Sequence, residues 1–111
     1  MPALTTQKVI EAGIEPTYAT ADVGGDTFDN DGRTILHIKN GDASPMTATV
    51  AALVSSTEKP GFGTLAKADA AITVSATDDG FLGPFPVGAF GPNPGIAYSA
   101  VTSVTIAVLR I

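Results

Sequence analysis

The chain has one histidine, His37, and this residue offers the most versatile acid–base chemistry in the sequence. A histidine works as a general base when a nucleophile and an orienting acid lie beside it. The residues around His37 in the sequence supply neither, because the neighbours on its side of a strand are Arg33 and Lys39. We interpret His37 as a surface or interface residue, and we expect a protein that is not an enzyme and has no catalytic residues.

The acidic cluster in residues 26–31 precedes Gly32, a pattern similar to the start of a calcium-binding EF-hand loop. If Gly32 took the invariant glycine position of that loop, Thr27 would be the first ligand and Ile38 the last. Neither side chain can ligate as the loop requires. We therefore expect a solvated turn, no bound metal and no cofactor.

The amino-acid composition also bears on nucleic-acid binding and on glycan binding. The net charge is −5, which disfavours nucleic acid as a partner, since Lys and Arg provide most of the binding free energy with a phosphate backbone. A sugar-stacking platform would lack its usual large residues, because Trp is absent and only Tyr18 and Tyr98 have polar rings. Glycan binding remains an alternative on this basis.

Any site must be held by a single domain, since 111 residues leave no room for a second ordinary core. The 12 Gly and 8 Pro residues interrupt long helices and suit short strands joined by turns. With no Cys, the chain has no disulfide and no cysteine metal site. No apolar run reaches the length of a signal peptide or a membrane span, so we expect no membrane partner.

Alternating residues predict the strands. Thr34, Leu36 and Ile38 share the core-facing side of one strand, which we expect to pair as a hairpin with a second strand at 46–54. Residues 101–111 form a last strand that is moderately apolar on both faces, which is typical of the middle of a sheet. The chain is therefore predicted to be all-β, a single antiparallel β-sandwich of immunoglobulin-like or jelly-roll-like type.

The first sixteen residues differ from the rest. Thr6 is a candidate cap for a short helix over residues 7–12, with Gly13 as its end. We divide the chain into an N-terminal arm at 1–16 and a sandwich domain at 17–111. A helix this short is marginal alone, so the arm either docks on the domain or moves freely. We expect it to be mobile in the free protein and to become ordered on a partner.

Three segments carry a resemblance to a known family. They are residues 25–41 (Gly-Asp-Thr-Phe-Asp-Asn-Asp-Gly-Arg-Thr-Ile-Leu-His-Ile-Lys-Asn-Gly), 83–86 (Gly-Pro-Phe-Pro) and 98–105 (Tyr-Ser-Ala-Val-Thr-Ser-Val-Thr). The chain resembles small virion proteins encoded among the structural genes of tailed bacteriophages. These motifs are signatures of turns and strands, and no catalytic residue carries over with them.

The resemblance implies a β-sandwich protein of the phage particle that is made in the host cytoplasm and located in the virion. Its implied function is capsid decoration and stabilisation, with a tail or head-fibre component or a glycan-binding or host-surface module as the alternative. The implied partner is the major capsid protein or another virion protein, and a homo-oligomer is also open. Our candidate partner-binding residues are apolar residues of the arm and of the Pro-rich segment, namely Leu4, Val9, Ile10, Ile14, Phe81, Phe85 and Phe90.

Overall fold

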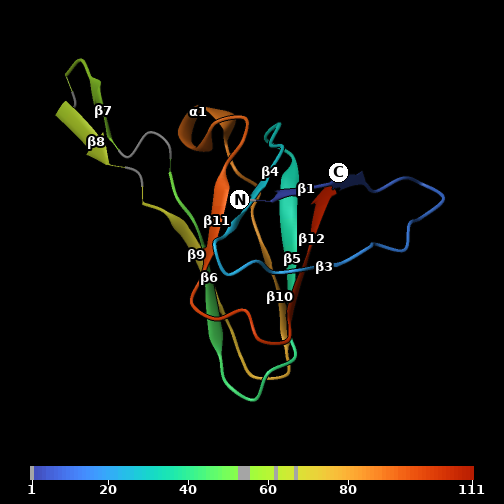
Figure 1. Ribbon diagram of the computed structural model, residues 1–111. Helices are drawn as coiled ribbons and strands as arrows, with labels where there is room; N and C mark the ends of the chain where they lie inside the picture. Colours follow the sequence, from blue (N-terminus) through green and yellow to red (C-terminus); the bar gives the residue numbers. More distant parts are fainter. Residues whose placement is uncertain (1, 53–55, 62, 67) are drawn as a thin grey trace.

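Alternation of side chains explains why the chain forms two packed sheets. In β5 (Thr34–Asn40), Thr34, Leu36 and Ile38 are fully buried, and in β6 (Met46–Val50) every second residue is buried. The computed structural model describes residues 2–52, 56–61, 63–66 and 68–111. It shows two sheets packed as a sandwich, which confirms the predicted all-β fold (Figure 1). Among the described residues, the helical segment is the four-residue α1 (Val87–Phe90).

The first sheet, called sheet A here, has the strand order β1-β4-β11-β6-β9. Its outward positions carry small or hydroxylated side chains: Thr47 lies opposite Thr73, and Thr49 lies opposite both Ala71 and Ala97. Besides β6, its strands are β1 (Ala3–Leu4), β4 (Asp26–Phe28), β9 (Ala70–Val74) and β11 (Gly95–Tyr98).

The second sheet, sheet B, has the order β10-β5-β12-β2, and β3 adds to β12 beside β2. The last strand is central, as its two apolar faces predicted. The Pro-rich segment, residues 81–94, begins in the edge strand β10, a position that prolines nearby favour because they cannot donate to a central ladder. Besides β5, the strands are β2 (Thr6–Lys8), β3 (Ala19–Thr20), β10 (Asp79–Leu82) and β12 (Val104–Arg110).

The predicted hairpin between the strands on either side of residues 41–45 is wrong, because β5 belongs to sheet B and β6 to sheet A. The buried side chain of Asn40 holds this crossing. Its amide donates to the carbonyl of Ser44 at 2.8 Å and to that of Val74 at 3.2 Å, while its Oδ1 accepts from the amide of Asp42 at 3.1 Å. The chain therefore turns from one layer to the other rather than back along the same sheet.

The predicted N-terminal helix is also wrong. β1 pairs in parallel with β4, and β2 pairs in parallel with β12, so the segment passes from sheet A to sheet B at Thr5. The side chain of Gln7 reinforces this path: its Nε2 donates to the carbonyl of Thr17, and its Oε1 accepts from the Thr17 amide, both at 2.8 Å. Residues 3–8 are thus docked in both sheets, which differs from the mobile arm that we expected in the free protein.

An aromatic cluster fills one end of the core. The ring centroids of Phe28 and Phe85 are 5.5 Å apart, and those of Phe85 and Phe90 are 5.3 Å apart with an edge-on geometry. Offset and edge-on contacts of this kind add to the free energy gained from burying the rings. The segment after β10 is therefore anchored by its Phe residues, which turn inward.

A separate two-stranded sheet lies outside the sandwich. It consists of β7 (Ser56–Lys59) and β8 (Gly63–Ala66) and projects from the upper left of the molecule in Figure 1. The loop between β2 and β3 extends from the opposite side. The main body between them carries the residues considered next.

Candidate functional site

The outer face of sheet B differs in character from that of sheet A. Strand registers place Phe81 opposite His37, and His37 opposite Ala107, in one row across three strands. Tyr18 directly precedes β3, whose Ala19 pairs with Ile106, so the register continues this row to Tyr18. Adjacent rows on the same face carry Lys39 with Asp79 and Thr105, and Ile35 with Leu109 and Gln7. Arg33, Ile111 and Val9 each lie one residue beyond a paired strand, and extending the registers places them in a further row.

His37 is the centre of a polar cluster on this face. Its Nδ1 lies 2.6 Å from the hydroxyl of Tyr18, and its Nε2 lies 2.6 Å from a carboxylate oxygen of Asp79. Its ring stacks on that of Phe81 with centroids 4.3 Å apart, and Lys39 Nζ lies 4.1 Å from the centre of the Tyr18 ring. His37 is 8% exposed, so the residue that we placed on the surface is largely covered by its partners.

The small side chain of Ala107 makes this cluster possible. Tyr18 enters from the β3 side of β12, and His37 lies on the other side of β12, so the tyrosine must cross that strand to reach the imidazole. Ala107, between them in the row, is 3% exposed although it is on the outer face. We infer that the Tyr18 ring covers Ala107.

The order carboxylate, imidazole, hydroxyl is the order of groups in acid–base catalysis. The hydrogen bond from His37 holds the pKa of Asp79 below its ordinary value, which keeps the carboxylate ionised and the imidazole oriented. The hydroxyl is that of a phenol, which can both donate and accept a hydrogen bond. The two hydrogen bonds of His37 therefore fix the position of Tyr18 relative to Asp79.

The other half of the face is apolar and open. Phe81 is 60% exposed, Ile111 is 69% exposed and Val9 is 42% exposed. Beside them lies a hollow of about 380 Å³ lined by Gly32, Arg33, Ile35, Pro84 and Ile111. Exposed large apolar side chains that share one face of a sheet are typical of a surface that binds another molecule.

The predicted partner-binding residues differ in their burial. Val9, Ile10 and Phe81 are among the exposed large hydrophobic residues, Leu4 packs against the core, and Ile14 is half-buried. The prediction is wrong for Phe85 and Phe90. They are 0% and 3% exposed because they form the aromatic core cluster, so they are not part of the candidate surface. Sequence reasoning missed Ile35 and Ile111, which the strand alternation could have placed beside Phe81.

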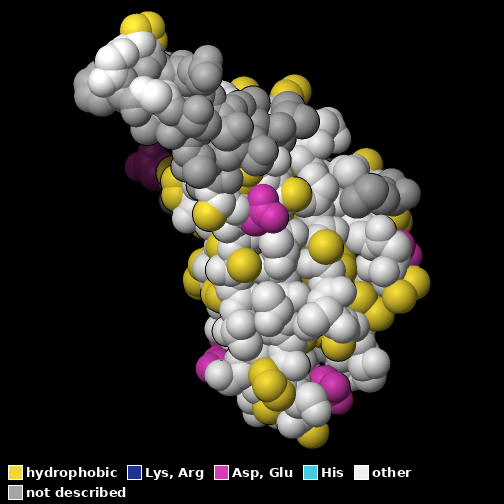
Figure 2. Space-filling model, turned by 90° about the vertical axis from the view of Figure 1, so that its left-hand side faces the viewer, with side chains coloured by type: hydrophobic (Ala, Val, Ile, Leu, Met, Phe, Trp, Pro, Cys, Tyr) yellow, Lys and Arg dark blue, Asp and Glu magenta, His cyan; other side chains and the backbone are white. Residues whose placement is uncertain are grey.

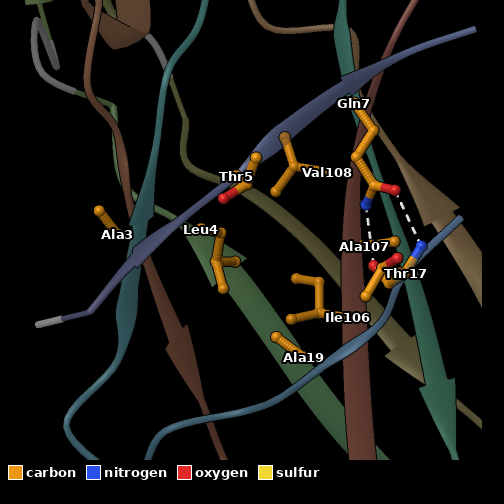
Figure 3. A pocket seen from close by; sticks show the side chains of 9 residues that line it. All are labelled: Ala3, Leu4, Thr5, Gln7, Thr17, Ala19, Ile106, Ala107 and Val108. Carbon is orange, nitrogen blue, oxygen red and sulfur yellow. Dashed lines mark hydrogen bonds between the residues drawn. The ribbon is translucent and has the colours of Figure 1, made fainter.

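A second hollow, of about 400 Å³, lies where the N-terminal segment meets β12. Figure 3 shows Leu4 and Ile106 lining it, with the hydrogen-bonded Gln7 and Thr17 at one side. The remaining lining residues are Ala3, Thr5, Ala19, Ala107 and Val108. The hollow marks the place where β2 and β3 leave part of the β12 edge uncovered.

The carboxylates of the acidic turn have protein partners. Asp29 accepts a hydrogen bond from Asn93, and Asp31 forms an ion pair with Arg110 at 3.4 Å. The hydrogen bond from the Arg33 amide, aided by Arg110, lowers the pKa of Asp31. In the described ranges no three His, Asp or Glu side chains are placed to hold a metal ion together.

Asp26 lies apart from the turn and is 1% exposed. Its Oδ2 accepts from the Tyr98 hydroxyl at 2.7 Å and from the Asp22 amide at 3.3 Å, while its Oδ1 has no hydrogen-bond partner among the described residues. Burial, together with the nearby carboxylate of Asp26, raises the pKa of Tyr98. This pair ties β4 to β11 inside sheet A.

No protein-family model matches the chain, and no curated protein or solved structure is similar enough to match it. Within the described residues, no helix has the length and apolar character needed to cross a membrane.

Proposed function

We propose that the protein is a non-enzymatic structural protein of a bacteriophage virion, which decorates the capsid and stabilises it by binding across neighbouring major capsid protein subunits. The proposal combines the resemblance of residues 25–41, 83–86 and 98–105 to small virion proteins with the character of the outer face of sheet B. The chain acts by binding, so its effect follows from added contacts rather than from a reaction.

One observation carries the proposal: the two outer faces of the sandwich are unequal. Sheet A presents Thr and Ala, whereas sheet B presents Phe81, Ile111 and Val9 to solvent. Burying an exposed large apolar side chain in an interface contributes roughly 1.5–3 kcal/mol at full burial. The outer face of sheet B is therefore the face that gains most free energy from contact with a shell.

Decoration stabilises a shell through mass action and multiple attachment. A protein that binds only the intact arrangement of subunits raises the free energy needed to rupture it. If one copy contacts two subunits, the second contact forms at a high effective concentration and detachment is slow.

The test is co-sedimentation of the purified protein with capsids of the source phage from which the native copies have been stripped, together with the rupture temperature of those capsids. We expect saturable binding and a higher rupture temperature with the protein bound. Phe81→Ser should weaken binding at least about tenfold, by the loss of a well-buried anchor. Val23→Ser is the matched control, because Val23 is 85% exposed and lies outside this face.

The alternative is a tail or head-fibre component, or a module that binds a host-surface glycan, and one feature favours the glycan reading. The exposed ring of Phe81 lies beside the hydrogen-bonding groups of Asp79 and Lys39. An aromatic face next to polar groups is suited to stacking on a sugar. A glycan array with hits that Phe81→Ser abolishes, together with no binding to stripped capsids, would replace the capsid proposal with this one.

A further inference from the structure

We propose that the hollow beside Arg33 binds an apolar side chain that is flanked by a carboxylate on a protein partner. This inference rests on the proposed function, because it assumes that the outer face of sheet B is the docking face. It adds the chemistry of the segment that docks.

The lining of the hollow suits an apolar side chain. Ile35, Pro84 and Ile111 supply apolar walls, and Gly32 leaves space at one side. The amide of Ile111 donates to the carbonyl of Arg33 at 3.4 Å, which keeps the exposed isoleucine at the edge of the hollow. An aliphatic side chain inserted there would cover Ile111 and the exposed part of Ile35.

The charged side chain of Arg33 is available to a partner. In the part of the chain that the structure describes, no ion pair involves the Arg33 side chain. Asp31, two residues away, is paired with Arg110 instead. Asp79, which lies in β10 on this face, is hydrogen-bonded to His37.

The charge at the hollow favours a partner segment that carries a carboxylate. Arg33 is the charged residue that lines the hollow, in a chain whose net charge is −5. On the opposite side, which Figure 2 shows, the charged side chains visible among the described residues are carboxylates. A second copy that docked face to face would bring like cations together, whereas an acidic segment would pair with Arg33, whose planar guanidinium can grip a carboxylate with two hydrogen bonds.

The experiment titrates the full chain with two blocked tetrapeptides and follows backbone amide resonances by NMR. One peptide is acetyl-Asp-Leu-Leu-Asp-amide, and the other is the neutral acetyl-Asn-Leu-Leu-Asn-amide. We expect both to shift the amides of Gly32, Arg33, Ile35 and Ile111, with the acidic peptide binding about two- to fivefold more tightly, as one exposed ion pair allows.

Arg33→Gln should remove the preference for the acidic peptide and keep the shifts caused by the leucines. Lys8→Gln is the matched control, because Lys8 is an exposed cation that does not line the hollow, and it should keep the preference. Equal binding of the two peptides by the unaltered protein would overturn the inference, and so would the absence of shifts at the hollow. Shifts at these residues that grow with protein concentration alone would assign the hollow to a second copy and also overturn it.

The outcome is separable from the proposed function. Capsid binding that depends on Phe81 but shows no acidic preference in the peptide titration would remove this inference and keep the function. A preference of the hollow for the acidic peptide, without any binding of the protein to capsids, would remove the proposed function and keep this inference.

Discussion

The hydroxyl of Tyr18 lies 2.6 Å from Nδ1 of His37, and this contact connects the start of β3 to β5 across the whole width of β12. His37 passes the connection on to Asp79 on the edge strand β10. Hydrogen bonds from Tyr18 through His37 to Asp79 therefore span the outer face of sheet B. The exposed ring of Phe81 takes its orientation from stacking on His37.

Tyr18→Phe tests this connection, because it keeps the ring and removes one hydrogen bond. We expect the free energy of unfolding to fall by about 1 kcal/mol, which is the usual net contribution of such a bond. Hydrogen exchange at the amides of β3 should speed up more than exchange in β6. Unchanged stability and unchanged exchange at β3 would show that the bond does not hold the segment.

Leu4→Ala tests the docking of the N-terminal segment. Leu4 packs against the core between the two sheets, so we expect a loss of about 1–3 kcal/mol and a fall of several degrees in the melting temperature. Val9→Ala is the control, because Val9 is 42% exposed, and it should change the melting temperature little. A Leu4 variant as stable as the original chain would restore the freely moving arm that the sequence suggested.

Much of the sandwich could be predicted because every second residue of β5 and of β6 is buried in the core. Leu36 and Ile38 were placed correctly on this ground, as was the central position of the strand that contains Val108. The corner after Asn40 could not be predicted, because its hydrogen bonds reach Val74, which is 34 residues away. The short strand at Thr6–Lys8 was missed because its pairing with β12 overrides a weak local helix preference.

The candidate site was less accessible to sequence reasoning. Phe81 was recognised as a candidate, but the partners of His37 were not, because Tyr18 and Asp79 are separated from it by 19 and 42 residues. The inward turn of Phe85 was missed because two prolines and an apolar run carry no periodic signal that distinguishes surface from core. Residues far apart in sequence come together on the sheet face only through strand registers.

The Tyr98 hydroxyl predicts a pH dependence of stability at the alkaline end. Because burial beside Asp26 raises its folded-state pKa above the ordinary 10.0, its contribution is complete below about pH 10 and is lost as the pH rises further. Urea unfolding at pH 8 to 12 should show this decline. In Tyr98→Phe the decline should be shallower than in Tyr18→Phe, and overall stability should be lower by about 1–3 kcal/mol, because buried Asp26 loses its hydroxyl donor.

Calcium should leave the stability unchanged. Asp29 and Asp31 are occupied by Asn93 and Arg110, and the turn lacks EF-hand ligands at both ends. We expect the same melting temperature with millimolar calcium and with a chelator. A rise of several degrees with calcium would reveal a metal site and contradict this prediction.

The central claim is that the chain docks on a capsid through the outer face of sheet B, and a cryo-electron microscopy map of the purified source particle tests it most directly. The account predicts density of this fold on the shell, bridging adjacent major capsid protein subunits, with Phe81 and the hollow beside Arg33 against the shell surface. Density of this fold in the tail or fibres, or on the shell with sheet A facing the capsid subunits, would contradict it.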